Sequence, residues 1–210
     1  MKRIMCFGDS NTWGAIPNQQ ERYDTSIRWT RLLAKMLGEE YEIIEEAQNG
    51  RTTVFTDVIE ERMAGIDYFV PCLDSQSPLD LIIMMLGTND LKTRFDVNAW
   101  SIADGLRRYD NALKTTRNAG KFPKMLLVAP IRIHPGYKND PLFHDLWGED
   151  GVERSKGFAD AYREAAALYG WDFLNAADYA EASEKDGIHM EPEGHAALAA
   201  AIAEKVREIL

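Results

Sequence analysis

The chain has 210 residues, and 24 lysines and arginines against 34 aspartates and glutamates give a formal net charge of −10. With 45% hydrophobic and 28% charged residues, the composition is that of a soluble globular protein. The acidic balance, without a dense basic block, argues against a nucleic-acid partner, since such a surface needs clustered positive charge. The length predicts one domain spanning residues 1–210.

Two cysteines, Cys6 and Cys72, are too few for a disulfide framework, and both lie in apolar stretches. The apolar run at the N-terminus is too short for a signal-peptide core. No stretch approaches the roughly 18 consecutive apolar residues of a membrane span. We therefore expect a reduced, cytoplasmic protein that has no membrane partner.

Short apolar runs alternate with amphipathic segments along the chain. The run from Leu81 to Leu86 has no polar alternation, which is typical of a strand buried on both faces of a parallel sheet. The alternation predicts an α/β fold, a three-layer α/β/α sandwich with a central parallel sheet. In chain order the predicted strands are residues 4–7, 41–44, 79–86, 125–129 and 171–174. The predicted helices are residues 27–37, 97–118 with Asp96 as N-cap, 152–169 and 192–210.

Two stretches fit neither pattern. Residues 52–78 are expected to be helical only in part. Residues 131–151 combine prolines and glycines with aromatic and histidine side chains, and long loops of this kind are usually functional or interfacial. The second stretch follows a strand, at the carboxyl edge where open α/β sheets bind ligands.

Polar residues follow the strands at this same predicted edge. The first strand leads into Gly8-Asp9-Ser10-Asn11, the second into Asn49-Gly50, and the central one into Gly87-Thr88-Asn89-Asp90. Near the C-terminus, Asp186 precedes His189 by three residues, a spacing that would bring the two side chains together on a helical turn.

These residue types predict acyl transfer by a serine. The Ser10 hydroxyl needs a base, which His189 would supply, and Asp186 would orient the imidazole and stabilise its charged form. The oxyanion of the transition state needs donors, and the candidates are the backbone N–H groups of Ser10 and Gly50 and the side-chain amide of Asn89. The nucleophile elbow of the α/β-hydrolases is absent around Ser10.

Each element also has an ordinary explanation. A serine after a first strand is more often a helix cap or a phosphate contact, and an Asp-x-x-His pair arises by chance. One alternative is a non-catalytic flavodoxin-like module whose loop at residues 10–13 cradles a phosphate or nucleotide at a helix N-terminus. Against it, that loop has no glycine-rich run and no adjacent basic residue. A second alternative is an inactive scaffold that assembles into oligomers.

The same residues carry a family resemblance. Gly8-Asp9-Ser10, Gly50, Gly87-Thr88-Asn89-Asp90 and Asp186-Gly187-Ile188-His189 resemble the four blocks of the SGNH (GDSL-like) hydrolases. Similarity to the bacterial arylesterase/acyltransferase branch runs nearly end to end. The resemblance implies a flavodoxin-like sheet and a serine esterase without metal or organic cofactor. It also implies small acetyl, aryl or acetylated-carbohydrate ester substrates, acyl transfer to alcohols, and a homo-oligomer.

The chain departs from this branch in two places. Asn11 follows the serine where the branch often has leucine, and Ala47-Gln48-Asn49 replaces a Gly-Leu-Ser-like stretch before the oxyanion residue. Gly50 stands where close relatives can carry alanine, and we expect glycine in its place to be harmless for a backbone donor.

Further side chains near the blocks have expected roles. Trp13 is the candidate substrate-binding residue, and Asp9 is expected to order its loop by hydrogen bonding. Arg51 and Asp90 are expected to steady the oxyanion loops. Of the other histidines, His195 is expected to be structural or exposed, and His134 and His144 to face solvent. No other group of residues has the spacing of metal ligands.

Overall fold

The computed structural model describes residues 1–116 and 120–210. Within these residues, five parallel strands form one sheet in the order β2-β1-β3-β4-β5. This is the flavodoxin-like order, which places the topological switch point between β1 and β3. The predicted α/β fold with a central parallel sheet is confirmed. The strands are β1 (Lys2–Gly8), β2 (Tyr41–Ala47), β3 (Leu81–Met85), β4 (Lys124–Ala129) and β5 (Asp172–Asn175).

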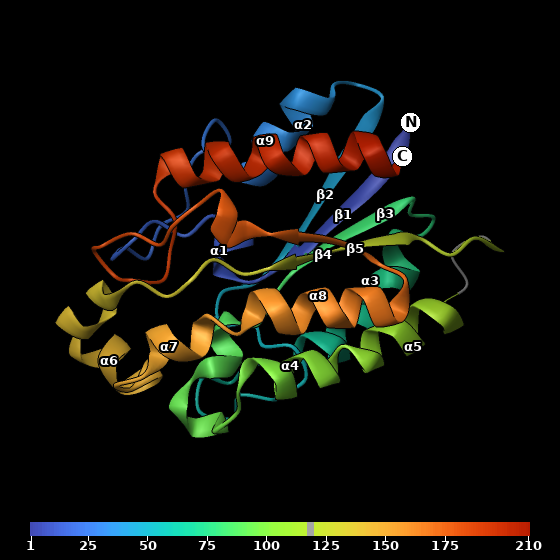
Figure 1. Cartoon of the computed structure of the whole chain (residues 1–210). Helices are drawn as coiled ribbons and strands as arrows, with labels where there is room; N and C mark the ends of the chain where they lie inside the picture. The colour runs from blue at the N-terminus through green and yellow to red at the C-terminus, as the bar shows by residue number, and fades with distance from the viewer. Residues whose placement is uncertain (117–119) are drawn as a thin grey trace.

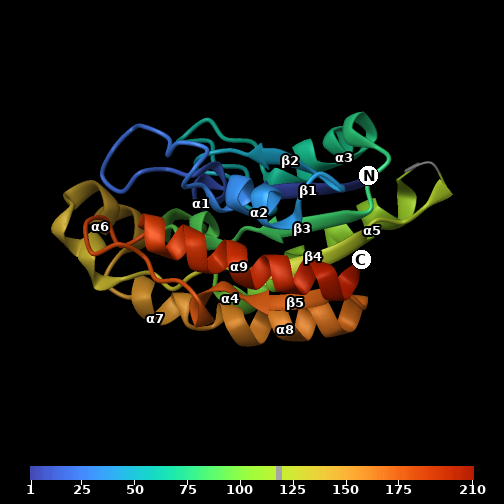
Figure 2. The same ribbon diagram turned by 90° about the horizontal axis from the view of Figure 1, so that it is seen from above.

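Helices cover both faces of the sheet (Figures 1 and 2). One face carries α2 (Trp29–Leu37) and α9 (Pro192–Ile209). The other carries α3 (Gly65–Gln76), α4 (Ala99–Gly105), α5 (Arg107–Thr115) and α8 (Phe158–Tyr169). No helix in the described part of the chain is long and apolar enough to cross a membrane.

The pleat of the strands divides the core in two. In β1, Ile4 and Cys6 pack into the cluster under α2 and α9, whereas Met5 and Phe7 pack into the cluster on the opposite face. All five residues of β3 are buried, as expected for a strand covered on both sides. Burial of both faces fixes the strand register, since a slip of one residue would exchange the two sets of side chains.

Two predicted helices are each broken in the structure. Residues 97–118 form α4 and α5, and the N-cap is Asn98, which accepts a hydrogen bond from Ser101 N, rather than Asp96. Asp96 instead has φ +47 after a short 3₁₀ turn, so it lies outside the helix. Residues 117 and 118 lie outside the described residues. Residues 152–169 form α7 (Gly151–Ser155) and α8, with the break at Lys156-Gly157.

The carboxyl ends of the strands share one edge with the short helices α1 (Ser10–Trp13), α6 (Pro141–Trp147) and α7 (Figure 1). The 3₁₀ turns η1 (Thr88–Leu91), η2 (Thr93–Phe95), η4 (Pro135–Asn139) and η5 (Ala176–Asp178) complete the connections. The two chain ends lie at the opposite edge of the sheet (Figure 1). The residues predicted to be chemically important therefore gather where parallel strands finish.

Candidate active site

Ser10 is the first residue of a single helical turn that follows β1 directly. Asp9 caps this turn, because its Oδ1 accepts a hydrogen bond of 3.0 Å from Asn11 N. The turn packs so closely on the sheet that a Cβ at Gly8 would lie 2.0 Å from Thr12 Oγ1. Asp9 is buried, and burial raises its pKa to about 6. Asp9 thus orders the loop, as expected from the sequence.

A chain of hydrogen bonds joins Ser10 to His189 and Asp186. His189 Nε2 lies 2.9 Å from Ser10 Oγ, and His189 Nδ1 lies 2.8 Å from Asp186 Oδ2. Asp186 is fully buried, while Ser10 and His189 line a common pocket. The geometry lets the imidazole take a proton from the hydroxyl while the carboxylate holds the other ring nitrogen.

Asp186 and His189 meet through a tight turn rather than through the predicted helical turn. Asp186 Oδ1 accepts hydrogen bonds from Ile188 N at 2.9 Å and from His189 N at 3.0 Å. Gly187 has φ +72, and a Cβ there would lie 2.3 Å from His134 O, so the turn requires glycine. Asn18 N donates a fourth hydrogen bond, to Asp186 Oδ2 at 3.1 Å.

These donors control the charge of Asp186. Burial acts to raise the pKa of this carboxyl, but the hydrogen bonds and charge of His189 and the backbone N–H groups outweigh it and hold the pKa below its ordinary value. Asp186 is therefore ionised at neutral pH, as a group that stabilises an imidazolium must be.

The three candidate oxyanion donors lie around the same pocket. The first N–H groups of a helix have no partner within it, which leaves Ser10 N free to donate. Asn89 follows β3 in η1, and its Nδ2 donates to Arg51 O at 3.2 Å. Gly50 occupies a turn with φ +77, and a Cβ would lie 3.1 Å from Glu60 Oε2. Glycine therefore suits this turn, because the left-handed backbone disfavours any side chain.

Arg51 and Asp90 brace the loops that carry these donors. Arg51 Nη1 donates to Gly8 O at 3.0 Å and to Glu46 O at 2.6 Å, and its guanidinium lies 4.4 Å from the centre of the Phe7 ring. Asp90 accepts hydrogen bonds from both the backbone and the hydroxyl of Thr53, and burial raises its pKa to about 7. These contacts tie the ends of β1, β2 and β3 together.

The pocket has a volume of about 490 Å³ and a lining of two kinds. The apolar part includes Ile188 and four side chains of α6: Leu142, Phe143, Leu146 and Trp147. The polar part includes Gln19, Gln20, Asn49, Glu60 and Lys92. The segment at residues 131–151 thus contributes to the site, although α6 was expected to be loop.

Trp13 is not among the residues that line this pocket. Its ring lies 5.3 Å from the Arg22 guanidinium, which also donates to the Trp13 carbonyl. The structure therefore does not bring Trp13 to the other predicted site residues, and its role in substrate binding stays a prediction.

A charged cluster beside the pocket was not predicted. Lys92 is 2% exposed, and its Nζ lies 2.7 Å from both carboxylate oxygens of Glu60. Arg94 bridges Glu60 and the buried Asp57 at 3.1 and 3.0 Å. The cluster fastens residues 57–60 to the segment after Asn89. The position of Lys92, two residues after the Gly87–Asp90 block, could have marked it as a residue near the site. No sequence pattern marked Glu60.

The remaining histidines lie elsewhere. His195 is fully buried at the start of α9, and burial lowers its pKa to about 4. His134 and His144 do not line the pocket. No group of three histidine, cysteine or acidic side chains in residues 1–116 and 120–210 is placed to hold a metal ion.

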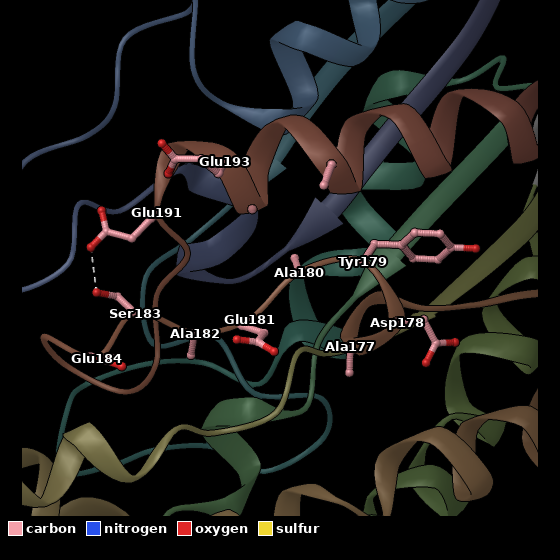
Figure 3. A pocket seen from close by; sticks show the side chains of 12 residues that line it. Ala177, Asp178, Tyr179, Ala180, Glu181, Ala182, Ser183, Glu184, Glu191 and Glu193 are labelled. Carbon is pink, nitrogen blue, oxygen red and sulfur yellow. Dashed lines mark hydrogen bonds between the residues drawn. The ribbon is translucent and has the colours of Figure 1, made fainter.

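A second hollow, of about 560 Å³, lies beside the start of α9 (Figure 3). It is lined by residues 177–184 and the start of α9, and contains none of the triad residues. Here Ser183 Oγ donates to Glu191 Oε1 at 2.6 Å, and Lys185 Nζ lies 2.9 Å from the same oxygen. These contacts close the base of the histidine loop, which we define as residues 183–191.

Known proteins are similar to this chain in sequence and in fold. The GDSL-like Lipase/Acylhydrolase family matches residues 6–197. The structure of the native aryl esterase of M. smegmatis is 35% identical, with a TM-score of 0.94 and 100% of each chain covered. Est24, a carbohydrate acetylesterase from Sinorhizobium meliloti, is 37% identical, with the same TM-score and coverage. None of the curated proteins is significantly similar to the chain in sequence.

A more distant structure, the lipase/acylhydrolase from Enterococcus faecalis, is 17% identical with a TM-score of 0.64 and covers 99% of this chain and 96% of its own. At that identity the likeness shows the fold alone. The family match and the similar esterases do not favour a phosphate-binding module. The chain belongs to the GDSL-like lipase/acylhydrolase family, the SGNH hydrolases, and is a carboxylic ester hydrolase.

Proposed function

We propose that the enzyme hydrolyses small acyl esters through an acyl-serine intermediate on Ser10. The observation that carries this proposal is the hydrogen-bond chain from Ser10 Oγ through His189 to the buried Asp186, at 2.9 and 2.8 Å, with Ser10 and His189 at a pocket wall. Asn89, Gly50 and the Ser10 amide border the same pocket, where an oxyanion would need donors.

In the first half-reaction, Ser10 Oγ attacks the ester carbonyl carbon while His189 Nε2 takes the hydroxyl proton. The bond between the acyl carbon and the leaving oxygen then breaks, and His189 returns the proton to that oxygen. In the second half-reaction, His189 takes a proton from water as the water oxygen attacks the acyl carbon. Ser10 leaves with the proton, and the carboxylic acid is released.

The pocket supports small acetyl, aryl or acetylated-carbohydrate esters. A volume of about 490 Å³ suits a compact substrate, the α6 side chains suit an acyl or aryl group, and the polar side chains of the lining suit hydroxyl groups. The aryl esterase of M. smegmatis and the carbohydrate acetylesterase of Sinorhizobium meliloti act on such esters by name. An alcohol that occupies the polar part of the pocket would replace water in the second half-reaction, which gives acyl transfer.

The first experiment replaces the nucleophile. Ser10→Ala should lower kcat for p-nitrophenyl acetate on the order of 10⁶-fold, as loss of the nucleophile does in a serine triad. It should also abolish labelling by a fluorophosphonate probe. Ser155→Ala is the matched control, because Ser155 is a buried serine with hydroxyl hydrogen bonds away from the pocket. Full activity of Ser10→Ala, or labelling of another residue by the probe, would refute the proposal.

A series of aryl and sugar esters with increasing acyl length tests the substrate class. We expect kcat/KM to fall once the acyl chain outgrows the apolar part of the pocket, and added alcohol to divert acyl groups from acid to ester product. Equal rates for long and short chains would contradict the assignment of small esters.

We also propose that the enzyme is a cytoplasmic homo-oligomer. Exposed apolar side chains beside the pocket support self-association, namely Val58, Ile59, Met63 and Leu142. Both cysteines are free and buried, which suits a reducing compartment. Light scattering should give a mass above that of one chain, and a monomer over the whole concentration range would refute the oligomer.

A further inference from the structure

We infer that Asn11 is the positioning residue that holds His189 in line with Ser10, by clamping the backbone on both sides of the histidine. This inference rests on the proposed function and adds a residue to it. Asn11 Nδ2 donates to Ile188 O at 3.0 Å, and Asn11 Oδ1 accepts from Met190 N at 3.0 Å. One side-chain amide therefore grips the residue before His189 and the residue after it.

The clamp completes the hydrogen bonding of the backbone around His189. His189 N donates to Asp186 Oδ1 at 3.0 Å, and His189 O accepts from Ser183 N at 2.7 Å. Those two groups lie within the histidine loop. Ile188 O and Met190 N, on either side of His189, are bonded by Asn11 from another part of the chain, 177 and 179 residues away. Asn11 does what a neighbouring strand would do, because a primary amide carries the same donor and acceptor as a peptide group.

Rigidity at both ends makes the clamp effective. Asn11 is 3% exposed and stands next to Ser10 on α1, and its backbone N–H is held by Asp9. On the outer side, the contact of Ser183 with Glu191 closes the base of the histidine loop (Figure 3). The two hydrogen bonds of Asn11 act differently, since they fix the position of His189 relative to Ser10 itself. Any shift of the histidine loop away from α1 breaks both Asn11 hydrogen bonds.

Removal of the clamp leaves Ile188 O and Met190 N buried without partners, because both residues are almost fully buried. Buried backbone groups without partners are costly, so the histidine loop is expected to move until they find water or other partners. The distance of 2.9 Å between His189 Nε2 and Ser10 Oγ would then lengthen. Misplacement of a reacting group by about 1 Å lowers the rate about 10²-fold.

The test is Asn11→Ala, a side chain that forms neither hydrogen bond. We expect kcat for p-nitrophenyl acetate to fall about 10²-fold with a much smaller change in KM, because the α6 side chains of the pocket stay in place. The downfield proton NMR signal of the His189–Asp186 hydrogen bond should broaden or disappear. Asn175→Ala is the matched control: Asn175 is also buried, with a side-chain hydrogen bond to Asp178, and lies at the end of β5. It should keep kcat and the signal.

A second variant covers the case in which Asn11→Ala does not fold. Asn11→Asp keeps the acceptor for Met190 N but loses the donor to Ile188 O, so its kcat should lie between those of the wild type and of a variant without the clamp. Wild-type kcat in both variants, or a fall in KM alone, would overturn the inference. Ser10→Ala is measured alongside: activity there refutes the proposed function, whereas its loss together with unchanged Asn11 variants refutes only the clamp.

Discussion

Asp186→Asn is the substitution whose effect the structure specifies most closely. Four N–H groups point at this carboxylate: Ile188 N and His189 N at Oδ1, and His189 Nδ1 and Asn18 N at Oδ2. Asparagine has the same shape but only one acceptor oxygen. In either orientation its NH₂ group faces two donors, so one pair of hydrogen bonds is lost and replaced by a repulsive contact.

The orientation that keeps the backbone bonds at Ile188 and His189 turns the NH₂ group toward His189 Nδ1. That nitrogen must then be an acceptor, so the proton moves to Nε2 and points at Ser10 Oγ. The histidine can no longer take the serine proton, and the charged imidazolium loses its carboxylate. The same replacement in a measured serine triad lowers kcat about 10⁴-fold, which corresponds to about 5 kcal/mol of transition-state stabilisation.

The assay is steady-state hydrolysis of p-nitrophenyl acetate, with the thermal midpoint measured on the same samples. Asp110→Asn is the matched control, because Asp110 is also a buried acid, paired with Lys114 on α5 and remote from the pocket. It should keep activity within about twofold, in line with the small effect of a pair whose lysine is exposed. A fall of less than tenfold in folded Asp186→Asn would refute the assignment of Asp186 as the group that orients His189.

Two further predictions concern the oxyanion and the pH dependence of stability. Asn89→Ala should lower kcat by about 10²–10³-fold with little change in KM, since the amide donates to charge that develops in the transition state; a change confined to KM would contradict this role. Burial lowers the pKa of His195 from 6.5 to about 4, so the folded state binds this proton less readily than the unfolded chain. The contribution of neutral His195 to the free energy of unfolding is fully present above pH 6.5 and is lost as the pH falls toward 4. The free energy of unfolding falls by about 3 kcal/mol over this range. Urea unfolding of His195→Gln should show a smaller loss of stability over this range, and an unchanged slope would argue against a buried neutral histidine.

The strands were predictable because each is an apolar run long enough to be buried between helices. The apolar run Leu81–Leu86 alone identified a central strand, and Ser10 and Asn89 could be placed at strand ends because each follows an apolar run closely in the sequence. The structure brings Ser10 and Asp186 each within hydrogen-bond distance of His189.

Helix ends and local turns were less predictable, because close tertiary contacts decide them. The break between α4 and α5 lies at Leu106, directly after Gly105, where a Cβ would lie 2.7 Å from Val54 Cγ2, a neighbour far away in sequence. α3 was obscured by Pro71 inside the helix, although Ile66, Phe69 and Leu73 have helical spacing and are buried. The clamp by Asn11 and the ion pairs of Lys92 depend on partners that no local pattern reveals.

The separation of Ser10 and His189 in the sequence has a consequence for folding. The two residues are 179 positions apart, and their side chains meet only where the folded structure brings α1 and the histidine loop together. A contact between residues so far apart closes a very long loop, and the entropic cost of that closure is offset only by the packing of the rest of the fold. Ester hydrolysis by this protein consequently reports that its long-range packing is in place.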